Sequence, residues 1–397
     1  MAKKRILSGM RPTGKLHLGH YVGALENWIQ LQNEYESFHL IADYHVLTTK
    51  LDTSEIYNDS IDMLIDWLAA GLDPQKSPMF RQSQIKEHTE LYLIFSMLIT
   101  AARLERNPTV KDQVRDLNIQ NITYGHLGYP VLQTSDILLY KGDAVPVGED
   151  QVPHVEFTRE VARRFNHLYG KEPGYEEKAQ LAIKKLGSKK GKLYHELKDA
   201  YQEEGDDQAL EAGQSLIEEH QSLSIGDKER LLGYLEGGGK IILLEPEYKL
   251  APASKMIGLD GQKMSKSYNN TVALRESVED VQKKIKTMPT DPARVRRTDP
   301  GDPNKCPVWQ LHQVYSKDDV QDWVRKGCSS AGIGCIECKQ PIIDAITKEL
   351  KPMQERAIHY VENPDLVKSV VAEGCEKAGK LARETMREVR EAMGLDF

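Results

Sequence analysis

Two short stretches of this chain combine the residue types needed to handle phosphate groups. The first, "GMRPTGKLHLGHYVG", places glycines and two histidines, His17 and His20, at an expected turn between a strand and a helix. Backbone N–H groups at the start of a helix attract anions, and glycine lets a phosphate approach closely. Imidazole donors at this turn would stabilise negative charge on a transferring phosphate. A histidine that simply caps the helix is the alternative.

The second stretch, "GLDGQKMSKSYNN", carries Lys263 and Lys266 on a loop punctuated by glycine, which we expect to be mobile. Mobile lysines suit a charge that develops only in the transition state, such as that of departing pyrophosphate. Taken alone, a solvated lysine-rich turn is the simpler interpretation. The two stretches together, in this order, are far more specific than either one.

Four of the five cysteines form the pattern C-x21-C-x6-C-x2-C, made by Cys306, Cys328, Cys335 and Cys338. Four thiolates can bind one zinc ion in a tetrahedral site or hold an iron–sulfur cluster, and by ligand chemistry alone zinc is the commoner outcome. The fifth, Cys375, lies in the helical pattern "VVAEGCEKAGKLA" and is expected to pack.

Composition limits the class of protein. No apolar run approaches the roughly 18 residues that a membrane span needs, and the start "MAKKRILSGM" moves straight into polar sequence without a secretory signal. We therefore expect a cytoplasmic protein, where clustered cysteines indicate metal more often than disulfides. The net charge of −7 argues against a generally basic nucleic-acid coat, but it leaves a local basic face possible.

Short apolar runs alternate with helical patterns in the first part of the chain. "KKRILSGM", "SFHLIADYHVLT", "SPMFRQSQI" and "DAVPVGED" are expected strands, and the segments between them have helical periodicity. This alternation predicts an α/β fold with a parallel, doubly wound sheet. The stretch after Gly170 is rich in Lys, Glu and Gln and predicts a helical insertion, after which a sheet pattern returns at "KIILLEPEY". Beyond Tyr268 the pattern is helical.

"HLGH" and "KMSKS" resemble the paired signatures of the class I aminoacyl-tRNA synthetases. The segments "YPVLQTSDILLY" and "VGEDQVPHVEFTREVARRFN" are similar to the tryptophanyl branch of that family rather than to its tyrosyl branch. The resemblance implies a homodimer whose chain contains four parts: a Rossmann-like catalytic domain at 1–170, the insertion at 171–240, a continuation of the catalytic domain with the KMSKS loop at 241–270, and an all-helical anticodon-binding domain at 271–397.

The resemblance also implies roles for individual residues. His17, His20, Lys263 and Lys266 would be catalytic. The residues expected to contact ATP are Arg11, Pro12, Thr13, Gly19, His20, Gly148, Glu149, Asp150, Lys263, Met264, Ser265, Lys266 and Ser267. Those expected around tryptophan are Asp136, Tyr129, Gln151, His45 and Leu7, the last at a position where relatives often carry an aromatic residue.

The chemistry of indole fits these assignments. Indole is large and apolar with one N–H donor, so its pocket needs apolar walls and one acceptor, here Asp136 amid "SDILLY". Leaving a buried carboxylate unpaired is costly, which penalises analogues that lack the N–H. The resemblance implies activation of L-tryptophan by ATP and transfer to tRNA(Trp), for which positioning and electrostatics suffice. Magnesium is expected with the ATP phosphates.

Some tryptophanyl members of the family carry a [4Fe–4S] cluster in the anticodon-binding domain. Their first cysteine spacing is one residue longer than here, a difference that the loop "YSKDDV" could absorb. The resemblance thus favours the iron–sulfur cluster, with zinc as the alternative, and its duty would be to hold loops against the anticodon.

Two other functions remain open. An adenylate-forming relative would activate a small acid without tRNA, and a catalytically inactive paralogue would bind RNA as a regulator. The long helical tail with its cysteines speaks against the first, and the intact signatures with Asp136 and Asp150 speak against the second.

Overall fold

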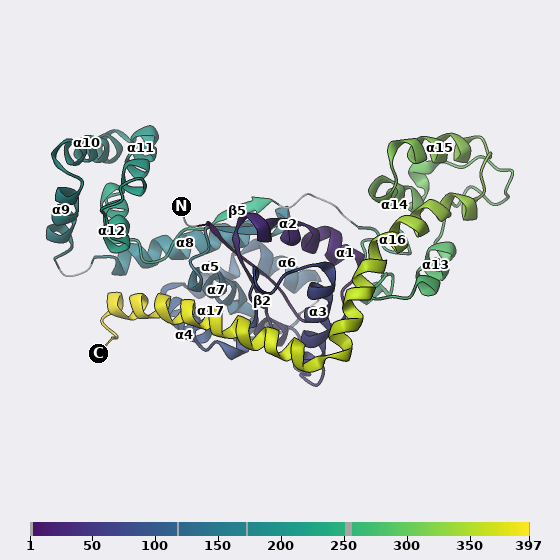
Figure 1. The fold of residues 1–397 in the computed structure, drawn as a ribbon, viewed down its shortest axis with the longest axis horizontal. Helices are drawn as coiled ribbons and strands as arrows, with labels where there is room; N and C mark the ends of the chain where they lie inside the picture. Colours follow the sequence, from purple (N-terminus) through teal and green to yellow (C-terminus); the bar gives the residue numbers. More distant parts are fainter. Residues whose placement is uncertain (1–2, 117–118, 172–173, 251–255, 397) are drawn as a thin grey trace.

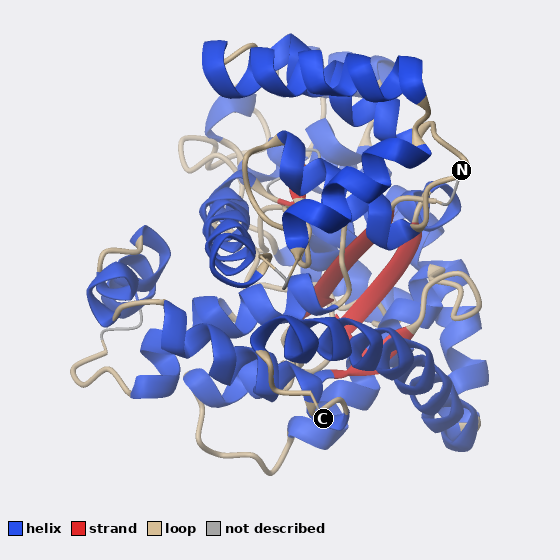
Figure 2. Cartoon of the chain, turned by 90° about the vertical axis from the view of Figure 1, so that its left-hand side faces the viewer, coloured by secondary structure: helices blue, strands red, loops and turns tan. Residues whose placement is uncertain are grey.

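A parallel five-stranded sheet forms the centre of the molecule, as the alternation of strands and helices predicts. The computed structural model describes residues 3–116, 119–171, 174–250 and 256–396. Within them the strands lie in the order β3-β2-β1-β4-β5, with helices packed around the sheet (Figures 1 and 2). The strands are β1 (Arg5–Met10), β2 (Glu36–Ile41), β3 (Met79–Arg81), β4 (Ala144–Val147) and β5 (Glu247–Leu250).

β1 lies in the middle of the sheet, and the chain adds β2 and β3 on one side of it and β4 and β5 on the other. β1 pairs with β2 along its whole length, from Arg5↔Glu36 to Met10↔Ile41. On its other side β1 pairs with β4 only at Ile6↔Ala144. In such sheets, ligands bind at the carboxyl ends of the strands where the order reverses. The fold therefore places the expected site just after β1 and β4.

The helices that precede the insertion cover this sheet. They are α1 (Leu18–His20), which continues through a π-helical turn (Tyr21–Leu25) into α2 (Glu26–Glu34), then α3 (Ile56–Ala70), α4 (Glu87–Leu98), α5 (Ala101–Glu105), α6 (Pro108–Asp116), α7 (Tyr124–Leu139) and α8 (Val152–Tyr169). In the described part of the chain, no helix combines the length and the apolar character that crossing a membrane would require.

Residues 174–240 form a helical unit at one end of the molecule (Figure 1). Its helices are α9 (Tyr175–Lys185), α10 (Ser188–Asp199), α11 (Asp207–Glu218) and α12 (Ile225–Leu235). They enclose a core of their own, which includes Ile183, Tyr194 and Leu231. The two ends of the unit meet, since the Lys240 amide donates to the Gly170 carbonyl oxygen at 2.8 Å. Residues 172 and 173 of the expected insertion lie outside the described residues.

The C-terminal helices lie at the opposite end and along one side of the sheet (Figure 1). They are α13 (Val278–Thr287), α14 (Pro307–Tyr315), α15 (Asp318–Ser329), α16 (Cys335–Glu362) and α17 (Pro364–Met393). α16 packs on α3, and α17 packs on β3 and α4. Ala378, Ala382 and Met386 of α17 belong to the same buried cluster as Phe80 and Phe95. The last helix thus completes the core of the sheet.

Three expected strands differ from the structure. The expected strand "SPMFRQSQI" is a strand only over Met79–Arg81 and continues as a 3-10 turn over Gln82–Gln84. The expected strand "SFHLIADYHVLT" ends at Ile41, and its second half forms a 3-10 turn over Tyr44–Thr48. The sheet pattern expected at "KIILLEPEY" forms its strand only from the end of that stretch, at Glu247–Leu250, and not at "KIILL". The reason is that the Asn166 side chain serves as the hydrogen-bond partner of this backbone: its Oδ1 accepts from the Ile242 and Leu243 amides, both at 3.0 Å.

Candidate functional site

A cavity of about 300 Å³ opens at the carboxyl ends of β1, β2 and β4. Its wall comes from the end of β1 with Arg11, from α7, and from the start of α8. The expected site residues that it brings together are Leu7, Arg11, His45, Tyr129, Asp136 and Gln151. These residues lie far apart along the chain, so the sheet and α7 are what assemble them.

Asp136 lies buried at this cavity and is held by three side chains. Its Oδ1 accepts hydrogen bonds from Gln82 Nε2 and His88 Nδ1, both at 2.7 Å. Its Oδ2 lies 2.9 Å from His45 Nε2 and 2.9 Å from Gln82 Nε2. Burial by itself would raise the pKa of Asp136, but the hydrogen bonds from His45 and His88 and the charges of both rings bring the pKa below its usual value. The carboxylate is therefore ionised and can only accept.

A second contact fixes the ring of His88. The Tyr140 hydroxyl lies 2.7 Å from His88 Nε2, and both side chains are fully buried. His88 Nδ1 carries a proton, because Nδ1 faces an acceptor-only carboxylate. Gln82 and His88 follow β3 and lie behind the residues that line the cavity. Nothing in their local sequence distinguishes them from other polar residues near the end of a strand.

Among the described residues, three polar atoms at the cavity have no hydrogen-bond partner: the hydroxyl of Tyr129, a residue expected from the sequence, and two others. Ser8 Oγ and His154 Nδ1 are both buried and unpaired, and both residues line the cavity. Burial lowers the pKa of His154 to about 4, so its ring is neutral near pH 7. Buried polar atoms without partners are uncommon and need an explanation, and a polar ligand in this cavity would supply one. Sequence reasoning missed both residues, although His154 lies within the segment "VGEDQVPHVEFTREVARRFN" that resembles the family.

The histidines of "HLGH" face each other at the helix start. His17 caps α1, and its ring centroid lies 3.8 Å from that of His20. Burial, followed by the charge of Lys266, lowers the pKa of His17 to about 4. Burial, with His17 and Lys266, lowers the pKa of His20 to about 3. Both rings are therefore neutral at pH 7.

The KMSKS loop is docked on this turn. Lys266 Nζ donates to the Thr13 carbonyl oxygen at 2.6 Å, and Met264 is buried with its amide bonded to the Met256 carbonyl at 3.0 Å. Asn270 braces the loop by accepting from the Ser265 amide at 2.8 Å. The structure thus brings the two signature stretches together, with the side chains of Lys263 and Ser267 exposed.

The remaining expected ATP residues lie around the same edge of the sheet. Gly148, Glu149 and Asp150 follow β4, and Gln151 Nε2 donates to Asp150 Oδ2 at 3.1 Å. Pro12 is buried in the turn after β1, while Gly19 lies within α1, where an added Cβ would come 3.0 Å from the His17 ring. The side chains of Glu149 and Asp150 are exposed and free to meet a ligand.

The four cysteines come from the N-cap of α14, the end of α15 and the first turn of α16. All four are free thiols, and Cys338 interacts electrostatically with each of the other three. His312 Nε2 lies 3.4 Å from Cys338 Sγ, a neighbour that the sequence spacing does not show. In the chain as described, no three His, Cys, Asp or Glu side chains have the arrangement of a metal site. By residue type alone, four thiols are a donor set that zinc and iron–sulfur clusters use.

Comparison with known proteins assigns the fold and site to a family. The family model for class I tRNA synthetases of the W and Y type matches residues 2–193 and 194–351. The chain therefore belongs to the class I tRNA synthetases for tryptophan and tyrosine. The tryptophan–tRNA ligase of Ralstonia nicotianae is 61% identical over 399 residues, covering 100% of both chains. That of Thermotoga maritima is 42% identical over 397 residues, covering 99% of this chain and 100% of the relative. Within the class, the chain belongs to the tryptophan–tRNA ligases.

Solved structures agree with this family. Tryptophanyl-tRNA synthetase from Campylobacter jejuni, complexed with ADP and tryptophan, superimposes with a TM-score of 0.73 at 27% sequence identity. The match covers 98% of this chain and 100% of that one. The synthetase from Mycoplasma pneumoniae, at 22% identity and a TM-score of 0.66, shares the fold.

Proposed function

We propose that this chain joins L-tryptophan to tRNA(Trp) in two steps at the cavity beside β1, with the residues described above in specific roles. The observation that carries this proposal is the ionised, buried Asp136 at a cavity whose apolar wall includes Leu7 and Ile137, next to two docked signature stretches. Apolar walls beside one strong acceptor match a tryptophan side chain, and the other polar residues of the lining could meet its amino and carboxylate groups.

In the first step, a carboxylate oxygen of tryptophan attacks the α-phosphorus of ATP. The bond from that phosphorus to the bridging oxygen breaks, and pyrophosphate leaves with the electron pair. Neutral His17 and His20 would donate to phosphate oxygens, while Lys263 and Lys266 would meet the charge that develops on pyrophosphate. Mg²⁺ would bind chiefly to the ATP phosphates and neutralise part of their charge.

The other site residues position the two substrates. Asp136 would accept the indole N–H, with Leu7 and His45 beside the ring, and Tyr129 and Gln151 would lie around the amino end. Because His45 already lies against Asp136 Oδ2 in this structure, the indole N–H would share or take that position. Arg11, Pro12, Thr13 and Gly19 would contact ATP at the turn, Gly148 to Asp150 would hold the adenosine, and Met264, Ser265 and Ser267 would complete the phosphate loop.

In the second step, a ribose hydroxyl at the 3′ end of tRNA attacks the carbonyl carbon of the adenylate. AMP leaves with the electron pair of the broken bond, and the hydroxyl loses its proton. Tryptophan-dependent exchange of pyrophosphate into ATP, followed by charging of tRNA(Trp), tests both steps. Exchange without charging would favour an adenylate-forming relative that does not use tRNA, and neither activity would favour an inactive RNA-binding paralogue.

The division into four parts belongs to the same proposal: catalytic residues 1–170 and 241–270, an insertion at 171–240 and an anticodon-binding region at 271–397. Residues 1–2, 117–118, 172–173, 251–255 and 397 lie outside the described residues. The proposal also includes a homodimer acting in the cytoplasm, where tRNA is used for translation. Sedimentation equilibrium of the purified chain measures the oligomeric state, and a monomer at working concentration would remove the dimer from the proposal.

Removal of the insertion is expected to leave tryptophan activation largely intact. The physical reason is that this unit has a core of its own, and that Gly170 and Lys240, at its two ends, are already in contact. The measurement is tryptophan-dependent pyrophosphate exchange by a variant in which a short glycine linker replaces residues 174–237. Because this deletion also removes the ion pair between Glu229 and Lys240, Glu229→Gln in the full chain is the matched control. A folded deletion variant that cannot activate tryptophan would place the unit in the catalytic core.

The four cysteines are proposed to hold one [4Fe–4S] cluster, with zinc as the alternative. Cys306, Cys328, Cys335 and Cys338 would be the ligands, and the cluster would supply structural support to the loops around it. Their place after the KMSKS loop, and the exposed basic side chains of Arg296 and Arg297 nearby, suit a support for tRNA contacts.

Iron, sulfide and zinc analysis with visible absorption on protein purified without oxygen decides the nature of the group. We expect iron and inorganic sulfide in equal amounts, whereas stoichiometric zinc without sulfide would identify a zinc site. Cys335→Ser should lose the group and reduce tRNA charging more than adenylate formation, and Cys375→Ser should keep the absorption. Equal loss of both reaction steps in Cys335→Ser would mean that the site supports the whole fold.

A further inference from the structure

The backbone of the "HLGH" turn is hydrogen-bonded directly to the segment that follows the KMSKS loop. The Leu18 amide donates to the Val272 carbonyl oxygen, and the Leu274 amide donates to the Leu16 carbonyl oxygen, both at 3.0 Å. Between them, His17 and Ala273 form an isolated antiparallel bridge. The chain that leaves the KMSKS loop is thus paired with the "HLGH" turn, so movement of one segment is transmitted to the other.

A buried acid on a third element holds this junction. Asp66 lies on α3, outside both motifs, and has no solvent exposure. Its Oδ2 accepts a hydrogen bond from the Leu16 amide at 2.6 Å, and its Oδ1 accepts from Arg275 Nε at 2.6 Å. One carboxylate therefore binds the backbone just before His17 and the side chain that follows Leu274.

Arg275 extends the junction along α3. Its Nη2 donates to Asp62 Oδ1 at 2.6 Å and to the Asp62 carbonyl oxygen at 3.3 Å. Asp59, Asp62 and Asp66 interact electrostatically with Lys266, whose ammonium lies against Thr13. Arg275 thus pairs with two carboxylates, one of them buried. A buried ion pair is favourable only when its geometry is good, so these contacts tolerate little displacement.

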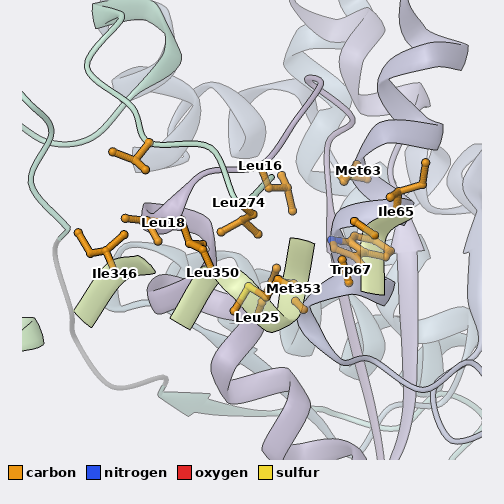
Figure 3. Close-up of a cluster of buried hydrophobic side chains, with 14 of the residues drawn as sticks. Leu16, Leu18, Leu25, Met63, Ile65, Trp67, Leu274, Ile346, Leu350 and Met353 are labelled. Carbon is orange, nitrogen blue, oxygen red and sulfur yellow. The ribbon is translucent and has the colours of Figure 1, made fainter. Parts of the chain in front are cut away.

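The surrounding core makes this arrangement rigid. Figure 3 shows side chains of the "HLGH" turn, α3, the segment after the KMSKS loop and α16 in one buried cluster, with the labelled members Leu16, Leu18, Leu25, Met63, Ile65, Trp67, Leu274, Ile346, Leu350 and Met353. Close-packed interiors move between discrete arrangements rather than deforming smoothly. The polar pair of Asp66 and Arg275, which adjoins Ile65, Trp67 and Leu274 of this cluster along the chain, therefore sets where the two signature stretches lie relative to each other.

We propose that Asp66 and Arg275 are positioning residues for adenylate formation, because they fix the distance between the phosphate-facing turn at His17 and the chain that carries Lys266. This inference rests on the proposed function of the KMSKS loop at the ATP phosphates. The pair touches neither substrate. It acts by keeping the donors of both stretches where the charge of the transition state develops.

The test uses Asp66→Asn, Arg275→Lys and Arg275→Gln in the full chain, with active sites counted from the burst of adenylate formation. We expect each variant to lower kcat for tryptophan-dependent pyrophosphate exchange about 10- to 100-fold per active site, because small displacements of reacting groups cost that much. The KM for ATP should change by less than about threefold, and tryptophan binding, measured by equilibrium dialysis, should stay unchanged. Arg275→Lys should retain more activity than Arg275→Gln, because it keeps the charge.

Two further variants separate positioning from stability. The double variant D66N/R275Q should be no slower than the slower single variant, because both act through one contact. Arg390→Gln breaks another arginine–carboxylate pair, with Glu90 across α17 and α4, and should lower Tm without changing kcat per active site.

Wild-type kcat per active site in folded Asp66 and Arg275 variants, with only Tm lowered, would overturn the inference and leave the proposed function intact. Additive losses in the double variant would also overturn it. If Lys266→Ala itself failed to slow adenylate formation, the proposed function of the loop would be wrong instead.

Discussion

Asp136→Ala is expected to raise the KM for tryptophan strongly and to relax discrimination against analogues of indole. A hydrogen bond to a charged group contributes about 1.5 to 3 kcal/mol, which corresponds to roughly 10- to 150-fold in affinity. The variant also leaves His45, Gln82 and His88 without the acceptor that all three share. The measurement is pyrophosphate exchange at varied tryptophan, with the KM for ATP determined at saturating tryptophan.

The most specific test compares pyrophosphate exchange with tryptophan and with an analogue in which sulfur replaces the indole nitrogen. The wild-type enzyme should reject it, because the carboxylate would lose a donor, whereas Asp136→Ala should accept the analogue and tryptophan almost equally. Asp136→Asn serves as the matched control of nearly the same shape and should fall between the two. Unchanged tryptophan kinetics in a folded Asp136→Ala protein would remove this residue from the binding site.

Lys266→Ala is expected to slow adenylate formation about 100- to 1,000-fold, the loss seen when one preorganised donor to a developing charge is removed. In this structure Lys266 Nζ donates to the Thr13 carbonyl oxygen, so the side chain must exchange that partner for the pyrophosphate as the reaction proceeds. An interaction gained mainly in the transition state lowers kcat and leaves the KM for ATP nearly unchanged.

Single-turnover formation of tryptophanyl-adenylate measures this step directly. Lys283→Ala removes an exposed lysine on α13, outside the site, and should behave as the wild type. A Lys266→Ala enzyme with normal turnover and only a raised KM for ATP would show that the contact is equally strong in the ground state.

The sequence alone determined the family, the sheet and the identity of the two phosphate-handling stretches. These features depend on residues that are close in the sequence. Strands and helices have characteristic hydrophobic periodicities, and the residues of a motif such as "HLGH" lie within one turn. The expected tryptophan residues Leu7, His45, Tyr129, Asp136 and Gln151 do line one cavity, because parallel strands bring their carboxyl ends to the same edge of the sheet.

Only the tertiary structure decided which partners these residues meet. Gln82 and His88 at Asp136, His312 beside Cys338, and Asp66 with Arg275 between the two signature stretches are contacts between distant parts of the chain. The strand expected at "KIILL" moved for the same reason, since the Asn166 side chain on α8 takes up its backbone groups. Such pairings follow from how whole elements pack and from the need to satisfy every buried polar group, and a local pattern in the sequence does not contain them.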